Sequence, residues 1–176
     1  PLQRQGVTAV VEAMQAHPQV ATVQKFGCFA LDTLTKKISS AGQQAAAETG
    51  AIEAALNAMQ AHLQDMQVQM TGLYALKSLC CGYEAAMLRA AEAGALRGAV
   101  AAMRAHPQVE MVQRAAIWVL VDFGKGEANK HRAAEAMERA VVFAAMKAFP
   151  KIKSTGQHLL DVLPTRRERG QNTGRV

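Results

Sequence analysis

Apolar residues recur along much of this chain at intervals of three and four, which is the spacing of one face of an α-helix. The stretch 110–123 shows the pattern most clearly, and two earlier stretches repeat it around a central small residue. We therefore expect three helices with these buried positions: Val112, Ala116, Val119, Leu120 and Phe123; Val68, Gly72, Ala75, Leu76 and Leu79; and Val23, Gly27, Ala30, Leu31 and Leu34. The small residues at 27, 72 and 116 should let neighbouring helices approach closely.

A short phrase that precedes each of these stretches recurs almost unchanged. It reads Ala-Met-Gln-Ala-His at 13–17 and 58–62, Ala-Met-Arg-Ala-His at 102–106 and Ala-Met-Lys-Ala-Phe at 145–149. Its methionines, at positions 14, 59, 103 and 146, are 45, 44 and 43 residues apart. A period of this length with helical patterning is typical of solenoids that stack two or three helices per repeat.

Each unit divides into three predicted helices. In the third copy a short first helix covers 84–93, a second helix covers 95–106 and a third helix covers 110–123. Pro107 ends the second helix because proline lacks the N–H that continues the hydrogen-bond ladder. The fourth copy is expected to begin with a first helix over 128–137.

The order of these features resembles the armadillo repeat. A glycine (Gly6, Gly50, Gly94) precedes each second helix, a short turn and Val-Gln follow it, and one third helix contains Gly-Cys-Phe-Ala-Leu-Asp-Thr-Leu. The resemblance covers roughly residues 5–163 and implies an all-α fold, a right-handed α-solenoid of about 3.5 repeats of ~44 residues. We place the repeats at 5–35, 36–80, 81–124 and 125–163 within a repeat domain, 1–163, followed by a basic tail, 164–176.

The side of each third helix opposite its buried face is free to meet a partner, since a helix turns by about 100° per residue. This side carries Lys25, Phe29 and Thr33, then Met70, Tyr74 and Ser78, then Arg114, Trp118 and Asp122, and finally Ser154, His158 and Val162. The resemblance implies a partner-binding groove along these columns. The column that holds Asn in peptide-binding armadillo proteins contains no amide here, so a folded partner or a specific helix is expected rather than any extended peptide.

The start of the stack is predicted to be a second binding surface. The first copy has only five residues before its second helix, so the apolar side of that helix should lie open for another subunit. The residues expected to be exposed there are Val7, Val10, Val11 and Met14. The chain begins at Pro1 rather than Met, so we expect a cytoplasmic location, or an organellar one after removal of a targeting segment.

Residues that could carry chemistry are sparse. His17, His62 and His106 repeat regularly, but neighbouring helices lie ~8–10 Å apart whereas zinc ligands lie about 2 Å from the metal. They are expected to complement the dipole at the ends of second helices, and neither a metal nor a cofactor is expected. No phosphate-binding loop or nucleophile motif occurs, and Cys80 and Cys81 are expected to pack in the core. The chain is therefore not expected to be an enzyme.

Charge and hydropathy narrow the partner class. The net charge is +6, and part of it comes from Arg166, Arg167 and Arg169 in the tail, which leaves the repeat domain close to neutral. Nucleic acid is thus a weakly supported partner. No apolar run approaches the ~18 residues that cross a bilayer, so membrane association is expected only through a complex.

These observations leave three hypotheses for function. The leading one is a non-catalytic scaffold or adaptor that binds protein through the groove, within a multi-subunit assembly. The first alternative is a peripheral structural subunit of a large complex, for example an organellar, membrane-bound one. The second alternative is a binder of nucleic acid or anionic surfaces that acts through the tail and scattered lysines and arginines.

Overall fold

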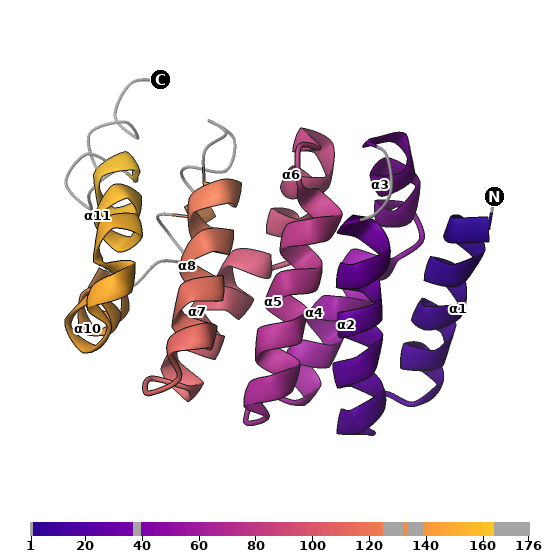
Figure 1. Ribbon diagram of the computed structural model, residues 1–176, viewed down its shortest axis with the longest axis horizontal. Helices are drawn as coiled ribbons and strands as arrows, with labels where there is room; N and C mark the ends of the chain where they lie inside the picture. Colours follow the sequence, from indigo (N-terminus) through magenta and orange to yellow (C-terminus); the bar gives the residue numbers. More distant parts are fainter. Residues whose placement is uncertain (1, 37–39, 125–131, 134–138, 164–176) are drawn as a thin grey trace, which may run out of the picture.

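The computed structural model is an elongated stack of helices with the N-terminus at one end and the C-terminus at the other (Figure 1). It describes residues 2–36, 40–124, 132–133 and 139–163, and these residues contain no strand. The second helices are α1 (Leu2–Ala16), α4 (Ala51–Ala61), α7 (Ala95–Ala105) and α10 (Arg139–Ala148). The third helices are α2 (Ala21–Lys36), α5 (Met66–Cys80), α8 (Glu110–Phe123) and α11 (Lys153–Val162). Two short first helices, α3 (Ser40–Ala47) and α6 (Glu84–Glu92), and a 3-10 turn, η1 (Pro150–Ile152), complete the described part.

The predicted all-α repeat is confirmed, and the helices of the third copy begin and end within one residue of their expected bounds. The expected first helix over 128–137 lies largely outside the described residues. Gly50 and Gly94 directly precede α4 and α7 with φ angles of 84° and 103°, a backbone conformation that favours glycine. The placement of Gly6 in the same role was wrong, because Gly6 lies inside α1.

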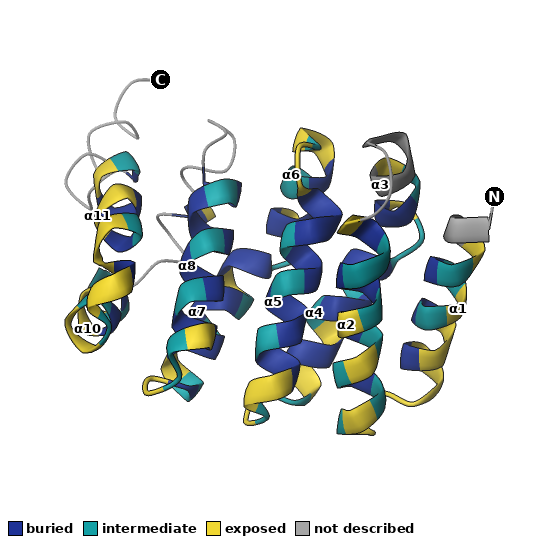
Figure 2. Ribbon diagram, in the orientation of Figure 1, coloured by how far each residue is buried: buried dark blue, intermediate teal, exposed yellow. Residues whose placement is uncertain are grey.

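The core runs through the middle of the stack and thins at its start (Figure 2). Every position predicted to be buried on α5 and α8 is buried, and so is Leu31 on α2. The prediction was wrong for four positions on α2, which are only partly buried: Val23, Gly27, Ala30 and Leu34. The reason is that α5 and α8 each pack against the third helix of the preceding repeat, whereas no third helix packs before α2 in this structure.

Methionines of the recurring phrase pack against glycines on the third helices. A Cβ atom on Gly27 would lie 2.4 Å from Met14 Cγ, and one on Gly72 would lie 2.5 Å from Met59 Cγ. Gly156 and Met146 repeat this arrangement at 2.6 Å. The expectation that small residues permit close helix packing is therefore confirmed at Gly27 and Gly72, and each of these methionines fills the notch left by a missing side chain.

A buried glutamine joins the second and third helices within each of the first three repeats. Gln113 donates from Nε2 to the carbonyls of Met103 (2.8 Å) and His106 (2.9 Å). The Met103 carbonyl needs this donor, because the residue four places on is Pro107, which has no N–H. Gln24 and Gln69 make the equivalent pairs of bonds. The Val-Gln element of the repeat is thus a structural one.

A histidine joins the second repeat to the first, and another joins the third repeat to the second. His62 and His106 occupy the C-caps of α4 and α7, as expected. Nε2 of His62 lies 2.8 Å from the Pro18 carbonyl oxygen, and Nε2 of His106 lies 2.8 Å from the Leu63 carbonyl oxygen. Since a carbonyl oxygen only accepts, Nε2 carries the proton and donates. These bonds tie a helix end to the preceding turn.

We expect His106→Ala to lower the free energy of unfolding by about 1–2 kcal/mol, because it removes a partly buried inter-repeat hydrogen bond. His17 is a natural control, since it is exposed and its ring has no hydrogen-bond partner among the described residues. His17→Ala should change stability by less than about 0.5 kcal/mol. Equilibrium urea denaturation measures both values, and equal effects would contradict the assigned role of His106.

Candidate functional site

The third helices present a continuous outer surface, and α2, α5, α8 and α11 lie side by side along it (Figure 1). We call this surface the third-helix face and define it by the predicted residues Lys25, Phe29, Thr33, Met70, Tyr74, Ser78, Arg114, Trp118, Asp122 and His158. Phe29 is 57% exposed, while Tyr74 and Trp118 are partly buried. The third helices of the first three repeats, α2, α5 and α8, therefore each carry an accessible aromatic ring at the same position.

Cations from neighbouring turns and helices lie near two of these rings, Tyr74 and Trp118. Lys77 of α5 places Nζ 3.9 Å from the centroid of the Trp118 ring on α8, and Cζ of Arg114 lies 5.4 Å from the same centroid. Lys36 of α2 reaches the Tyr74 ring of α5 at 5.9 Å. Aromatic rings attract cations at such distances through the negative potential of their faces. Tyr74 and Trp118 therefore each lie beside a lysine of the preceding third helix.

The sequence prediction missed Lys36 and Lys77, although helical spacing could have found both of them. Lys77 follows Tyr74 by three residues, so both side chains lie on the same side of α5. Lys36, in the last turn of α2, follows Phe29 by seven residues, which is about two helical turns and therefore the same side of α2. Both lysines lie beside the aromatic rings of the third-helix face and add positive charge around them.

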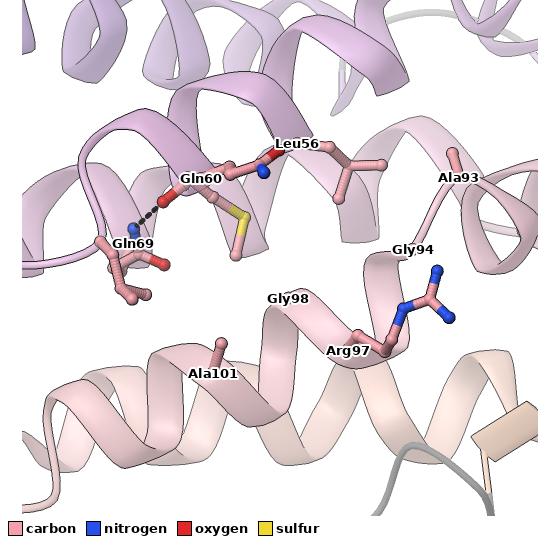
Figure 3. Close-up of a pocket in the computed structure, with 10 residues that line it drawn as sticks. Leu56, Gln60, Gln69, Ala93, Gly94, Arg97, Gly98 and Ala101 are labelled. Atoms are coloured by element: carbon pink, nitrogen blue, oxygen red, sulfur yellow. Dashed lines mark hydrogen bonds between the residues drawn. The ribbon is translucent and has the colours of Figure 1, made fainter.

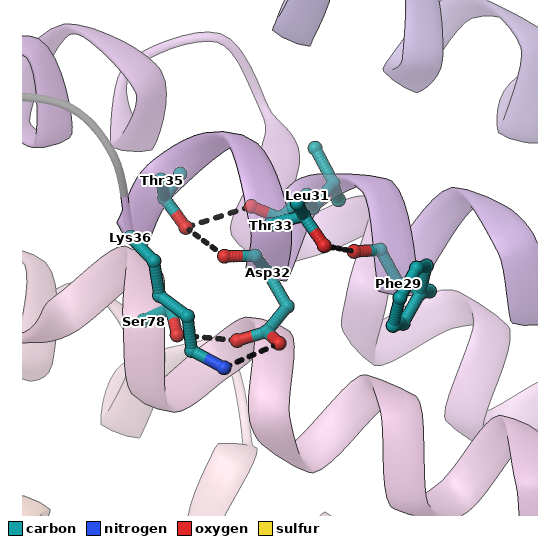
Figure 4. Close-up of polar contacts among 7 residues, drawn as sticks. All are labelled: Phe29, Leu31, Asp32, Thr33, Thr35, Lys36 and Ser78. Atoms are coloured by element: carbon teal, nitrogen blue, oxygen red, sulfur yellow. Dashed lines mark hydrogen bonds and ion pairs between the residues drawn. The ribbon is translucent and has the colours of Figure 1, made fainter.

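Ser78 was expected to be exposed on this face, and that expectation was wrong. Ser78 is buried, and its Oγ donates to Asp32 Oδ1 across the boundary between α5 and α2, at 2.5 Å (Figure 4). Asp32 also accepts from Lys36 Nζ at 2.7 Å through its other carboxylate oxygen. The cause is the close packing of α2 on α5, which encloses the short serine side chain between them.

In the column that carries Asn in peptide-binding armadillo proteins, two side chains already form hydrogen bonds within the chain. Thr33 Oγ1 donates to the Phe29 carbonyl at 2.9 Å, and Ser78 is bonded to Asp32 (Figure 4). Asp122 is partly buried, and Val162 in α11 offers no polar group. These side chains offer a partner's backbone fewer bonds than a row of Asn amides would.

The predicted open N-terminal end needs correction. Val7, Val11 and Met14 were expected to be exposed but are buried, because that side of α1 packs against α2, α3 and α4. Only Val10 of the four predicted residues is partly accessible. The apolar surface instead lies between α1 and α2, where Val10, Val23, Phe26 and Ala30 border a hollow of about 360 Å³. Phe26, which the sequence prediction missed, is 58% exposed there.

A second hollow, of about 330 Å³, lies between α4 and α7 (Figure 3). Its lining includes Leu56, Gln60, Arg97 and Gly98. Gly98 has no side chain that could fill the space between the two helices. The lining contains no carboxylate, hydroxyl or thiol, so it offers neither a nucleophile nor an acid–base pair.

The two adjacent cysteines at the end of α5 differ in burial. Burial raises the pKa of the Cys80 thiol to about 12, with smaller contributions from Cys81 and Glu53, so Cys80 is protonated at neutral pH. The expectation that Cys81 packs in the core was wrong, because Cys81 caps the end of α5 and is exposed. Within the described ranges, no group of three or more potential ligands could hold a metal ion. Arg166, Arg167 and Arg169 lie outside the described residues.

The architecture defines a class of protein, an armadillo-like solenoid in which helical repeats share one core. The family model of the LRRK2 ARM repeat matches residues 4–165, and the chain belongs to this armadillo repeat family. No curated protein and no solved structure matches the chain. Among the helices that the structure describes, none is long and apolar enough to span a membrane. An armadillo fold is a helical-repeat scaffold for protein interaction and is typically non-catalytic.

Proposed function

We propose that this chain is a non-catalytic scaffold or adaptor that binds a partner protein through the third-helix face. The supporting observation is the row of Phe29, Tyr74 and Trp118, which keeps accessible aromatic surface at a position that the core does not use. Tyrosine, tryptophan and arginine are the residues that most often dominate binding energy at protein interfaces. Arg114 beside Trp118 adds the third of these residue types.

The packing between helices also supports the third-helix face as the binding surface. The third helices contact one another more extensively than the second helices do. Helices that lie closer together occupy the inner side of a curved solenoid, and such inner surfaces are extended binding sites in repeat proteins. A partner on the third-helix face would therefore contact several repeats at once.

A photo-reactive amino acid tests this proposal when it replaces Tyr74 on the third-helix face or Arg97 on α7. We expect covalent capture of a partner from position 74 and none from position 97, which is exposed in the layer of second helices. The double variant Tyr74→Ala, Trp118→Ala should reduce capture of the same protein at position 29 at least tenfold, roughly the effect of losing two interface anchors. Circular dichroism must show an unchanged helical content for this comparison.

A second candidate function is a structural subunit that docks into a larger assembly through the start of the stack. The observation that favours it is the apolar hollow between α1 and α2, beside the exposed ring of Phe26. The variant Phe26→Asp separates the two candidates in the same capture experiment. If Phe26→Asp abolishes capture and the Tyr74, Trp118 double variant does not, the N-terminal end is the binding surface and the scaffold proposal is wrong.

A further inference from the structure

The cluster of Lys77, Trp118 and Arg114 carries positive charge that the fold does not neutralise. Two cations from different helices converge on one indole ring. No carboxylate of the described residues pairs with Lys77 or Arg114. Because both cations lie within 5.4 Å of the same ring centroid, their like charges repel each other, and the ring only partly compensates. A bound carboxylate would relieve that repulsion.

Arg114 is also poorly satisfied as a hydrogen-bond donor. Its Nη2 donates to the sulfur of Met111 at 3.0 Å, and a thioether is a weak acceptor. Its Nε is buried and has no partner. A guanidinium has five N–H donors and matches the two oxygens of a carboxylate. The cost of partly burying this guanidinium is thus not offset by a strong acceptor among the described residues, as it would be in a structural ion pair.

The other end of the face combines an exposed ring with a further cation. Lys25 places Nζ 4.3 Å from the Phe26 ring and forms no ion pair with a described carboxylate. Phe29 lies one turn after Lys25 and is mostly exposed. By contrast, Lys36 is already neutralised by Asp32. The face therefore offers an apolar contact on α2 and an unneutralised cationic site between α5 and α8.

We propose that the third-helix face binds an acidic amphipathic helix of a partner protein, with a carboxylate seated beside Trp118 between Lys77 and Arg114. This inference rests on the proposed scaffold function and specifies its ligand. A helix suits the face better than an extended peptide, because a helix satisfies its own backbone and Thr33 and Ser78 are already bonded internally. An apolar side chain of the same helix packs on Phe29.

The dimensions of the stack set the spacing of these two contacts. The helices α2 and α8 are two neighbour spacings apart, which is about 16–20 Å if each spacing is ~8–10 Å. An α-helix rises 1.5 Å per residue, so the apolar residue and the carboxylate should be roughly eleven to thirteen residues apart. Three helical turns take about eleven residues, so a spacing of about eleven places both side chains on the same side of the helix. The ligand is thus an amphipathic helix of about five turns.

Nucleic acid is less suited to this face. Its cations are interspersed with the carboxylates of Asp32 and Asp122, whereas phosphate backbones are bound by uninterrupted positive surface. Lys36 is held by Asp32 and is not available to a phosphate. The binding experiment therefore compares a single-stranded oligonucleotide with the acidic helix.

Labelled synthetic peptides test the proposal by fluorescence anisotropy with the full chain. The first is an alanine-based helical peptide of about five turns with Leu and Glu on one face, about eleven residues apart, and the second has Gln in place of every Glu. A third carries a central Pro that breaks the helix. We expect the Glu helix to bind, with an affinity that falls as salt rises, and the Gln and Pro peptides to bind at least tenfold more weakly, on the order expected for charge-assisted contacts.

Charge reversals in the chain locate the site. Lys77→Glu and Arg114→Glu should each weaken the Glu helix about tenfold or more. The matched controls Lys147→Glu and Arg97→Glu change exposed cations on the second helices and should leave its affinity unchanged. If a reversal perturbs folding, Lys77→Gln and Arg114→Gln replace it, with the same expected direction.

Three results would overturn the inference: equal binding of the Glu and Gln helices, equal weakening by Lys77→Glu and Lys147→Glu, or tighter binding of a 12-nucleotide single strand than of the Glu helix. The proposed scaffold function fails separately, when position 74 captures no partner. Capture at position 74 that survives Lys77→Glu would leave the scaffold in place and remove only the acidic ligand.

Discussion

Replacing Met59 by Ala is expected to lower the free energy of unfolding by about 2–5 kcal/mol. Met59 is 2% exposed and fills the notch over Gly72, where a Cβ atom would lie 2.5 Å from Met59 Cγ. Truncation removes buried methylene groups and the sulfur, and glycine has no side chain with which to refill the space. The loss should therefore lie well above the average for a point substitution.

Met66 provides the matched control for this experiment, because it begins α5 and is 48% exposed. Met66→Ala should change the free energy of unfolding by less than about 0.5 kcal/mol. Equilibrium denaturation in urea, followed by far-ultraviolet circular dichroism, compares both variants with the parent chain. Similar losses for the two methionines would show that the methionine–glycine packing contributes little.

Gln113→Leu is expected to cost about 2–4 kcal/mol, although the new side chain is apolar and similar in size. The substitution removes the donor that serves the Met103 and His106 carbonyls. The Met103 carbonyl then has no replacement from its own helix, because Pro107 has no N–H to offer. A buried acceptor without a donor loses its hydration and gains nothing in return.

The control for Gln113 is Gln108, which lies exposed in the turn between α7 and α8. Gln108→Leu should leave the free energy of unfolding within about 0.5 kcal/mol of the parent. Hydrogen exchange of the amides in α7 and α8 gives a second readout, since loss of the Gln113 bridge should accelerate exchange in these two helices first. A stability loss below about 1 kcal/mol for Gln113→Leu would contradict the bridging role.

The sequence predicted the fold well because the repeat supplies the same information several times. A helical pattern in one stretch is ambiguous, but Val68 to Leu79 and Val112 to Phe123 show it at matching positions. Those two stretches lie inside the stack, where a preceding repeat covers the same column. The first copy of the pattern, around Gly27, was wrong for all its predicted core positions except Leu31, because among the described residues α2 packs against only one third helix, α5.

The candidate site was only partly predictable, for a different reason. Helical periodicity assigns Phe29, Tyr74 and Trp118 to one side of their helices, which the structure supports. It does not indicate how closely α2 and α5 approach, and that approach buries Ser78 against Asp32. Contacts between repeats, such as Lys77 on Trp118, depend on the offset of one helix against the next, which no pattern within a single helix encodes.

The central claim is that the third-helix face, and not another surface, contacts the partner. Trp118 reports on this face alone, because it is the single tryptophan of the chain and gives one indole N–H signal in a ¹H–¹⁵N spectrum. When the protein captured at position 74 is added to the ¹⁵N-labelled chain, we predict that this signal shifts or broadens. An indole signal that stays in place while size-exclusion chromatography shows the complex has formed would contradict the account.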